Sequence, residues 1–171
     1  MDIVIRNVKL EDLEEVTKIQ IEGWQKNYRK IVDDEFLDNL DFRDTLEKRK
    51  RDYQENGFVV AVKDDKIAGF CRYLNDNSKS LEYPFIDCEI MALYIKEDMK
   101  RCGIGTKLVS YIKEEFRKIN KKRMVIWCLK DNFNARKFYE KIGGKELGEK
   151  EIIIGNKKYL ETGYVYKIGE E

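Results

Sequence analysis

The order of apolar segments between Phe85 and Leu129 limits the folds open to this chain more than any other feature. Phe85–Ile95 is almost continuously apolar, which predicts a strand covered on both faces. Thr106–Lys118 has the spacing of an amphipathic helix, and Arg123–Leu129 is a second buried-type strand. A strand, a helix and a strand in this order predict a right-handed crossover between two parallel strands.

The segments on either side predict further strands and helices around that crossover. The expected helices and strands are Asp2–Asn7 (strand), Glu11–Asn27, Asp33–Leu40 and Asp44–Glu55 (helices), Gly57–Lys63 and Lys66–Leu74 (hairpin), Asn132–Ile142 (helix), and Lys145–Ile154 with Lys157–Tyr166 (hairpin). A single proline, Pro84, and the lack of a Gly/Ser-rich linker favour one domain over residues 1–171. The expected fold is α/β, with a mixed, mostly antiparallel sheet of about seven strands, a central parallel pair and flanking helices.

Composition excludes several kinds of chemistry. The chain has no histidine, which rules out Ser-His-Asp and Cys-His hydrolases and any metal site built on imidazole. Its 34 basic and 33 acidic side chains leave a net charge of +1, which gives no long-range attraction to nucleic acid or an anionic membrane. The four cysteines form no CxxC pair and no signal peptide is evident, so we expect a cytoplasmic protein with reduced thiols and no metal.

The strongest local motif is the loop Lys100-Arg101-Cys102-Gly103-Ile104-Gly105-Thr106, between the first apolar run and the helix. Its two glycines let the backbone approach a ligand, and the following helix directs N–H groups into the same turn. Such a turn suits a phosphate or pyrophosphate. A dinucleotide-binding fingerprint would need a third glycine where Leu108 stands, and a P-loop would need its lysine directly after the second glycine. A tight loop without a ligand is the plain alternative.

Three motifs in order resemble those of the GNAT superfamily of N-acetyltransferases. The loop resembles the family's pyrophosphate signature Gln/Arg-x-x-Gly-x-Gly/Ala, with Lys100 in the first position. Glu89–Ile95 resembles the family's fourth strand, and Asn132–Gly143 resembles its Asn-x-x-Ala-x-x-Phe-Tyr-x-x-x-Gly segment. Gly144 stands where many members have phenylalanine. The similarity covers nearly the whole chain and implies acetyl transfer to an amine.

The resemblance also implies where acetyl-CoA binds. The family splays the two parallel strands apart, and the pantetheine arm then pairs with the backbone along Leu93, Tyr94 and Ile95. A backbone N–H near Met91 to Leu93 is expected to stabilise the thioester oxygen. The expected donor contacts are completed by Lys100, Arg101, Cys102, Gly103, Ile104, Gly105, Thr106, Asn132, Ala135 and Phe138.

An acceptor amine must lose its proton before it attacks. An amine with a pKa of about 10.4 is neutral about once in 2,500 at pH 7, a penalty of about 4.6 kcal/mol. Glu89 is the candidate base, because it interrupts an apolar central strand. An ion pair at the mouth of the strand and a water wire from several carboxylates, including Asp87 and Glu82, are the alternatives.

Tyr139 matches the tyrosine of the family's Phe-Tyr pair, which implies that it protonates the departing thiolate. Its helix spacing with Ala135, Phe138 and Ile142 is equally that of a core residue. Cys102 lies near positive charge and a helix start, which would favour a nucleophile. The resemblance implies direct transfer in a ternary complex instead, so we interpret Cys102 as a loop residue.

The acceptor is less well defined by the sequence. Trp24, Tyr28 and Asp87 are the candidate acceptor-binding residues, for a small-molecule or peptide amine. A non-catalytic acyl-CoA-binding or sensing module is the alternative function, although a sensor would not need both Glu89 and Tyr139. A nucleic-acid binder based on the basic run Lys113–Arg123 is disfavoured, because cations suit a helix C-terminus. A monomer and a homodimer both remain open.

Overall fold

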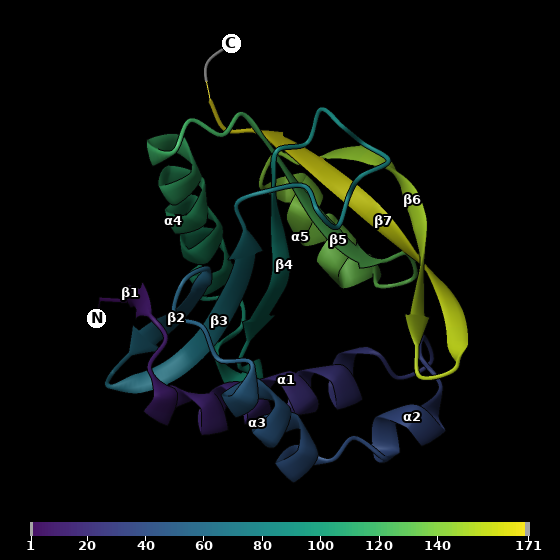
Figure 1. Ribbon diagram of the computed structural model, residues 1–171. Helices are drawn as coiled ribbons and strands as arrows, with labels where there is room; N and C mark the ends of the chain where they lie inside the picture. The colour runs from purple at the N-terminus through teal and green to yellow at the C-terminus, as the bar shows by residue number, and fades with distance from the viewer. Residues whose placement is uncertain (1, 170–171) are drawn as a thin grey trace. The chain divides into compact units, whose positions relative to one another are not determined.

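The computed structural model describes residues 2–169 and contains seven strands and five α-helices in the described part of the chain (Figure 1). The strands hydrogen-bond in the order β1-β2-β3-β4-β5-β7-β6. β4 and β5 are parallel, whereas β1–β2, β2–β3, β5–β7 and β6–β7 are antiparallel. The predicted fold class is therefore confirmed. The strands are β1 Val4–Asn7, β2 Phe58–Lys63, β3 Lys66–Leu74, β4 Cys88–Ile95, β5 Arg123–Leu129, β6 Lys145–Ile154 and β7 Lys157–Lys167.

The chain folds as two compact units. The first combines the residues up to Arg72 with Ala92–Val109, and the second combines Tyr73–Met91 with the residues from Ser110 onward. The boundary between them passes through β4 itself. The α-helices are α1 Leu13–Asn27, α2 Asp34–Asp38, α3 Phe42–Arg51, α4 Ile104–Lys118 and α5 Phe133–Lys141.

The core of the first unit lies between α1 and the strands β2 and β3. Val16 and Ile19 of α1 lie one turn apart and pack with Val60 of β2 and Phe70 of β3. α3 lies beside α1 (Figure 1). The predicted helix Asp44–Glu55 begins earlier, at Phe42, because the side chain of Asp41 accepts the Asp44 N–H at 2.8 Å and caps the first turn.

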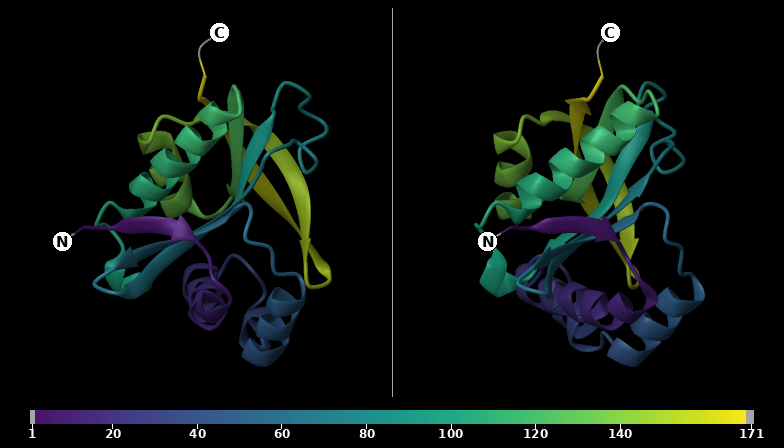
Figure 2. Two further views of the ribbon diagram at one scale, coloured as in Figure 1. Left: turned by 60° about the vertical axis from the view of Figure 1, so that its left-hand side comes forward. Right: turned by 90° about the vertical axis from the view of Figure 1, so that its left-hand side faces the viewer.

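Both predicted hairpins are present. Asp64 and Asp65 between β2 and β3 have φ values of 52° and 59°, the left-handed pair that a two-residue turn requires. The second hairpin turns at Gly155-Asn156 and joins β6 to β7, the long yellow ribbon of Figure 2. In the second unit, β7 pairs along its whole length with β5 or β6, which secures this end of the sheet.

The first strand of the crossover differs from the sequence prediction in where it begins and in how much of it is buried. The first strand begins at Cys88 and not at Phe85, because residues 80–86 form successive turns in which Tyr83 N donates to Ser80 O and Ile86 N to Tyr83 O. Burial on both faces holds only for Cys88–Ile90, since Met91 is 40% exposed and Ala92–Ile95 are partly exposed. The hydrophobicity of a segment predicts that it is buried, but it does not indicate which helices or strands bury each of its faces.

Candidate active site

The loop before α4 has the geometry of an anion-binding turn. Arg101 and Gly103 adopt left-handed φ values of 62° and 78°, and Lys107 N donates to Gly103 O at 3.0 Å as the first i→i−4 bond. The helix therefore starts at Ile104, two residues before the predicted start, and the N–H groups of its first turn have no intrahelical acceptor. Arg101, Cys102, Gly103 and Thr106 are exposed. Free N–H groups, a positive helix end and an exposed arginine fit a phosphate.

Lys100 is not a free surface cation, because its ammonium group is bonded to two side chains. Its Nζ donates to Asn27 Oδ1 at 3.0 Å and forms an ion pair with Glu97. Glu97 also accepts from Asn27 Nδ2 at 3.0 Å. These contacts connect the start of the loop to the C-terminal turn of α1, and they leave the backbone N–H groups and Arg101 as the groups of the loop that could meet an anion.

An aromatic cluster in the first unit brings three predicted site residues together. Trp24 Nε1 donates to the Tyr94 hydroxyl at 2.6 Å, and the Trp24 and Tyr28 rings lie 5.0 Å apart. Gly69 allows the backbone of β3 to approach, because a Cβ there would lie 2.6 Å from Tyr94 O. The predicted acceptor residues on α1 and a predicted donor residue on β4 are therefore neighbours, a link across 70 residues that no local pattern indicates.

Asp87 has a clear structural function just before β4. Its two carboxylate oxygens accept the backbone N–H groups of Lys122 at 2.8 Å and Arg123 at 3.0 Å. Asp87 N in turn donates to Arg123 O at 3.0 Å. These bonds align the start of β4 with the start of β5 and engage the carboxylate that the sequence suggested for acceptor binding.

Glu89 is a buried carboxylate in the parallel pair. It lies opposite Val125 of β5 and is 4% exposed. Burial raises its pKa to about 7, the nearby Lys150 and Lys79 lower it, and Glu161 raises it. A carboxyl with such a pKa is present in both protonation states near neutral pH, which suits an acid–base group.

A hydrogen-bonded serine connects Glu89 to a tryptophan. Trp127 Nε1 donates to Ser80 Oγ at 3.0 Å. The Ser80 hydroxyl in turn donates to Glu89 Oε2, with Oγ and Oε2 3.5 Å apart. Because the indole N–H can only donate, Ser80 has only its hydroxyl hydrogen to offer the carboxylate. The sequence analysis missed Ser80, Trp127, Lys150 and Glu161, and only the lone aromatic in an apolar strand hinted at Trp127.

Gly163 on β7 makes room for the Trp127 ring. A Cβ at this position would lie 2.8 to 3.0 Å from three ring carbons, closer than a flat, rigid indole allows. We expect Gly163→Ala to lower the free energy of unfolding by about 1–3 kcal/mol and to change the fluorescence of the indole. Urea unfolding followed by tryptophan emission tests this, and Gly155→Ala in the exposed hairpin turn, where strain is local, is the comparison. Unchanged emission in Gly163→Ala would contradict the placement of the ring.

Tyr139 is buried on α5, and Asn132 caps this helix. Asn132 Oδ1 accepts the Ala135 N–H at 3.3 Å, and the Tyr139 side chain is 7% exposed. The Tyr139 ring lies 6.0 Å from Tyr164, and its backbone oxygen accepts from the Tyr166 hydroxyl at 2.7 Å. The structure gives Tyr139 the packing of a core residue, which is compatible with either of its predicted roles.

Gly144 departs from the family pattern for a steric reason. A Cβ at this position would lie 2.6 Å from the Tyr166 hydroxyl oxygen and 2.8 Å from Tyr139 O. The side chain of Tyr166 therefore occupies the space that a larger residue at 144 would need.

The cysteines divide by burial. Cys71, Cys88 and Cys128 are buried, and burial raises the pKa of the Cys128 thiol to about 12 and those of the other two as well. Cys102 is exposed, and its Sγ lies 3.5 Å from Lys100 O. None of the three buried thiols is suited to nucleophilic attack, because the thiolate is disfavoured.

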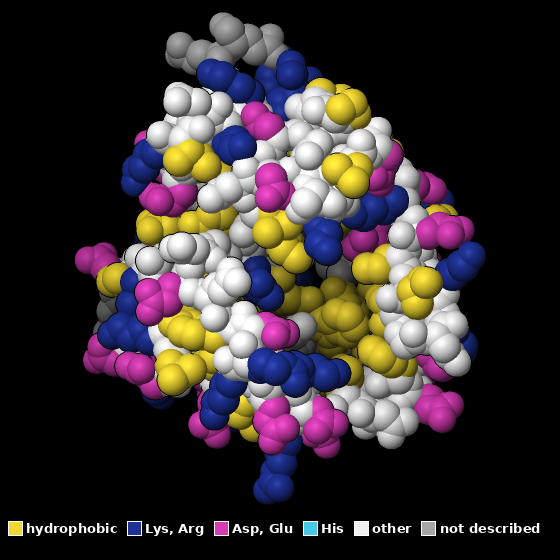
Figure 3. All heavy atoms as spheres, in the orientation of Figure 1, with side chains coloured by type: hydrophobic (Ala, Val, Ile, Leu, Met, Phe, Trp, Pro, Cys, Tyr) yellow, Lys and Arg dark blue, Asp and Glu magenta, His cyan; other side chains and the backbone are white. Residues whose placement is uncertain are grey.

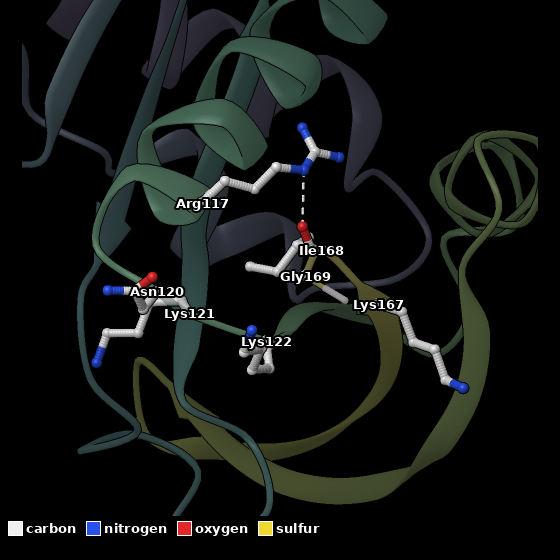
Figure 4. Close-up of a pocket in the computed structure, with 7 residues that line it drawn as sticks. All are labelled: Arg117, Asn120, Lys121, Lys122, Lys167, Ile168 and Gly169. Atoms are coloured by element: carbon white, nitrogen blue, oxygen red, sulfur yellow. Dashed lines mark hydrogen bonds between the residues drawn. The ribbon is translucent and has the colours of Figure 1, made fainter. Parts of the chain in front are cut away.

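Part of the basic run at the C-terminal end of α4 lines a pocket in the second unit (Figure 4). Arg117 Nε donates to Ile168 O at 2.7 Å, and Arg117 also pairs with Glu114 at 3.0 Å. Lys118 pairs with Glu115 at 2.6 Å. Basic and acidic side chains are likewise interspersed on the face shown in Figure 3. The run thus has the paired charges of a solvated helix end. Its pocket is lined by Arg117, Asn120, Lys121, Lys122, Lys167, Ile168 and Gly169.

Two negative findings apply to residues 2–169. Within this range no helix is long and apolar enough to cross a membrane. The same residues contain no group of three or more acidic or cysteine side chains arranged to hold a metal ion.

Comparison with known proteins agrees with the fold. The model of the acetyltransferase (GNAT) family matches residues 13–144. YuaI, an uncharacterized N-acetyltransferase of Bacillus subtilis, is 24% identical over 161 residues, which cover 94% of this chain and 91% of YuaI.

Solved structures share the same architecture. The PaiA N-acetyltransferase of Thermoplasma acidophilum, solved in complex with coenzyme A, has a TM-score of 0.70 at 22% identity and covers 95% of this chain and 98% of its own. YncA of Salmonella typhimurium, a putative acetyltransferase solved with acetyl-CoA, has a TM-score of 0.67 at 17% identity and covers 100% of this chain and 96% of its own. With a family model that spans most of its length, the chain belongs to the acetyltransferase (GNAT) family and is an acyltransferase.

Proposed function

We propose that this enzyme transfers the acetyl group of acetyl-CoA to a primary amine by direct attack in a ternary complex. Glu89 is the general base in this proposal and Tyr139 the general acid. The observation that carries it is the Glu89 carboxyl, which is buried in an apolar strand with a pKa raised to about 7. A group with this pKa accepts a proton at neutral pH without holding it so tightly that it cannot be released.

The donor side of the proposal uses the loop and the second half of β4. The backbone from Arg101 to Thr106 would hold the pyrophosphate, because it offers N–H groups and a left-handed glycine at Gly103. The backbone of Leu93, Tyr94 and Ile95 would pair with the pantetheine arm as an added strand does. Asn132, Ala135 and Phe138 on the α5 segment are assigned to the same arm by their family motif. Acetyl-CoA supplies the activated acyl group.

The acceptor side requires the protonated amine to lose one proton before it attacks. Glu89 takes that proton directly or through water, so the abundant ammonium form can be used although the neutral amine is rare at pH 7. The neutral amine then adds to the thioester carbon, the C–S bond breaks, and the nitrogen releases its second proton to solvent. Tyr139 gives a proton to the departing sulfur. Trp24 and Tyr28 remain the predicted contacts of the acceptor, whereas Asp87 is already engaged by two backbone N–H groups.

Glu89→Gln tests the base. We expect turnover to fall about 10- to 100-fold at pH 7, and less above pH 9, where more of the amine is already neutral. The acid limb of the parent enzyme's pH profile should have its midpoint near the Glu89 pKa of about 7 and should be absent in the variant. Glu82→Gln, a change at an exposed acid before the same strand, is the matched control and should leave the profile unchanged. A uniform loss of rate at every pH would contradict the base assignment.

Stability should change in the opposite direction from activity. The folded protein binds the Glu89 proton more tightly than the unfolded chain does, because the pKa rises from 4.5 to about 7 on folding. The stabilisation from this group is complete below pH 4.5 and is lost as the pH rises through about 7. At pH 8, Glu89→Gln should therefore be more stable than the parent by about 1–3 kcal/mol, measured by urea unfolding. A less stable variant would show that the carboxylate is satisfied in the fold.

A further inference from the structure

One face of the sheet in the second unit carries a set of charged and polar side chains around Glu89. Glu89 lies opposite Val125, and Trp127 follows two residues later on the same face of β5. Leu129, again two residues on, lies opposite Glu161 of β7, and Glu161 lies opposite Lys150 of β6. Strand register thus places Glu89, Trp127, Glu161 and Lys150 on one face, drawn from four neighbouring strands.

Two contacts fix the position of the Lys150 ammonium group. Its Nζ lies 4.4 Å from the centroid of the Trp127 ring and donates to Lys79 O at 3.1 Å. The ring itself is fixed by the absence of a side chain at Gly163 and by the bond from Trp127 Nε1 to Ser80 Oγ. A cation over an indole face gains attraction from the ring quadrupole, so the ammonium has a defined position and is not a mobile surface charge.

A continuous series of contacts then joins Lys150 to Glu89. The series runs from the ammonium to the indole, from the indole N–H to Ser80 Oγ, and from the Ser80 hydroxyl to Glu89 Oε2. The charged groups that face Glu89 are Lys150 on β6, Glu161 on β7 and Lys79 in the loop before β4. β5 contributes only apolar and aromatic side chains beside it, Val125 and Trp127. Lys150 is also the cation that acts on Glu161.

We propose that Lys150 is a positioning residue that keeps Glu89 in its proton-accepting carboxylate form, and that Glu161 opposes it. The proposal rests on the role of Glu89 as the base. A buried carboxylate without a cation nearby would stay protonated at neutral pH and could not accept the amine proton. Lys150 does not contact Glu89 as a direct ion pair partner would, so it shifts the protonation equilibrium without covering the oxygen atoms that must meet the amine.

Opposite shifts in two variants test the proposal. Lys150→Met keeps an unbranched chain over Trp127 but removes the charge. The midpoint of the acid limb in the pH profile of kcat/KM should therefore rise by about 0.5 to 1 pH unit. That shift corresponds to a loss of about three- to tenfold at pH 6, with little change at pH 9. Glu161→Gln removes the opposing charge and should move the limb down. General damage to the fold cannot produce shifts of opposite sign.

Two further variants separate charge from shape. Lys150→Arg keeps a cation over the ring and should retain most of the parent profile. Lys158→Met removes an exposed lysine near the end of the same hairpin, where it pairs with Glu151 at 3.7 Å, and should leave the limb in place. An unmoved limb in Lys150→Met, or the same direction of shift in Lys150→Met and Glu161→Gln, would overturn the proposal.

A direct titration distinguishes this inference from the proposed catalytic role. The Glu89 carboxyl carbon can be followed by NMR in protein labelled with 13C-glutamate, with Glu89→Gln to assign the signal. The titration midpoint should rise in Lys150→Met and fall in Glu161→Gln even when no substrate is present. If these midpoints move but Glu89→Gln retains full activity, Lys150 still controls Glu89 and only the base assignment fails. Midpoints that do not move would refute the role of Lys150 itself.

Discussion

Tyr139→Phe should lower turnover by about 10²-fold or more and leave the affinity for acetyl-CoA nearly unchanged. The proton of the hydroxyl is needed only as the C–S bond breaks, so its loss affects the transition state and not donor binding. The ring contacts with Phe138 and Tyr164 are retained, because phenylalanine has the same ring. Stopped-flow release of the CoA thiol, with donor affinity measured by calorimetry, gives both quantities.

A neighbouring tyrosine provides the matched control for this change. Tyr164 is fully buried beside Tyr139, and its hydroxyl accepts from Arg136 Nε at 2.9 Å and donates to Glu140 at 3.0 Å. Tyr164→Phe should reduce stability by about 1 kcal/mol and leave turnover close to the parent value. An acyl donor with a more acidic thiol should partly restore Tyr139→Phe, since a better leaving group needs less help. Equal turnover in Tyr139→Phe and the parent, with chemistry rate-limiting, would leave Tyr139 as a packing residue only.

Gly105→Glu should weaken the binding of acetyl-CoA by about 10²-fold or more, equivalent to about 2.7 kcal/mol. The substitution places a negative charge in the first turn of α4, where the proposed pyrophosphate would meet the helix N–H groups. The helix should not suffer, because glutamate has a higher helix propensity than glycine and an acid suits a helix N-terminus. Calorimetry with CoA and thermal unfolding of the free protein measure the two effects separately.

Two further variants test whether the negative charge at position 105 causes the weaker binding of acetyl-CoA. Gly105→Gln adds similar bulk without charge and should weaken binding less than Gly105→Glu. Ser110→Glu places the same charge at an exposed position further along α4 and should leave CoA binding near the parent value. Normal affinity in Gly105→Glu would mean that the donor phosphates bind elsewhere.

Local patterns were sufficient to predict the main elements of the fold. The hairpin pattern around Asp64-Asp65, the periodicity of Thr106–Lys118 and the Gly155-Asn156 turn each depend on neighbours in the sequence, and the structure confirms all three, with the helix two residues longer at its start. Strand boundaries were less predictable. Phe85 and Ile86 are apolar but lie in turns before β4, because the start of the strand is set by Asp87 and its bonds to the distant Lys122 and Arg123.

The candidate site was predictable only where a single residue stood out in its own segment. Glu89 is a lone charge in an apolar run, and two glycines mark the loop, so both were found from the sequence. Ser80 and Lys150 were not, because each is ordinary in its own segment and becomes significant only through contacts with residues distant in the sequence, to Trp127 and Lys79. Contacts between residues tens of positions apart carry no local signal.

Amine-dependent release of the CoA thiol tests the central claim most directly. The parent enzyme should be incubated with acetyl-CoA and a panel of alkyl amines, polyamines, amino acids and peptides, and the products identified by mass spectrometry. The account predicts that at least one primary amine gains an acetyl group as one thiol is released, with intersecting lines when both substrates are varied, as direct transfer requires. Parallel lines with an acetyl group carried on the protein, or donor binding with no amine-dependent release across the panel, would contradict it.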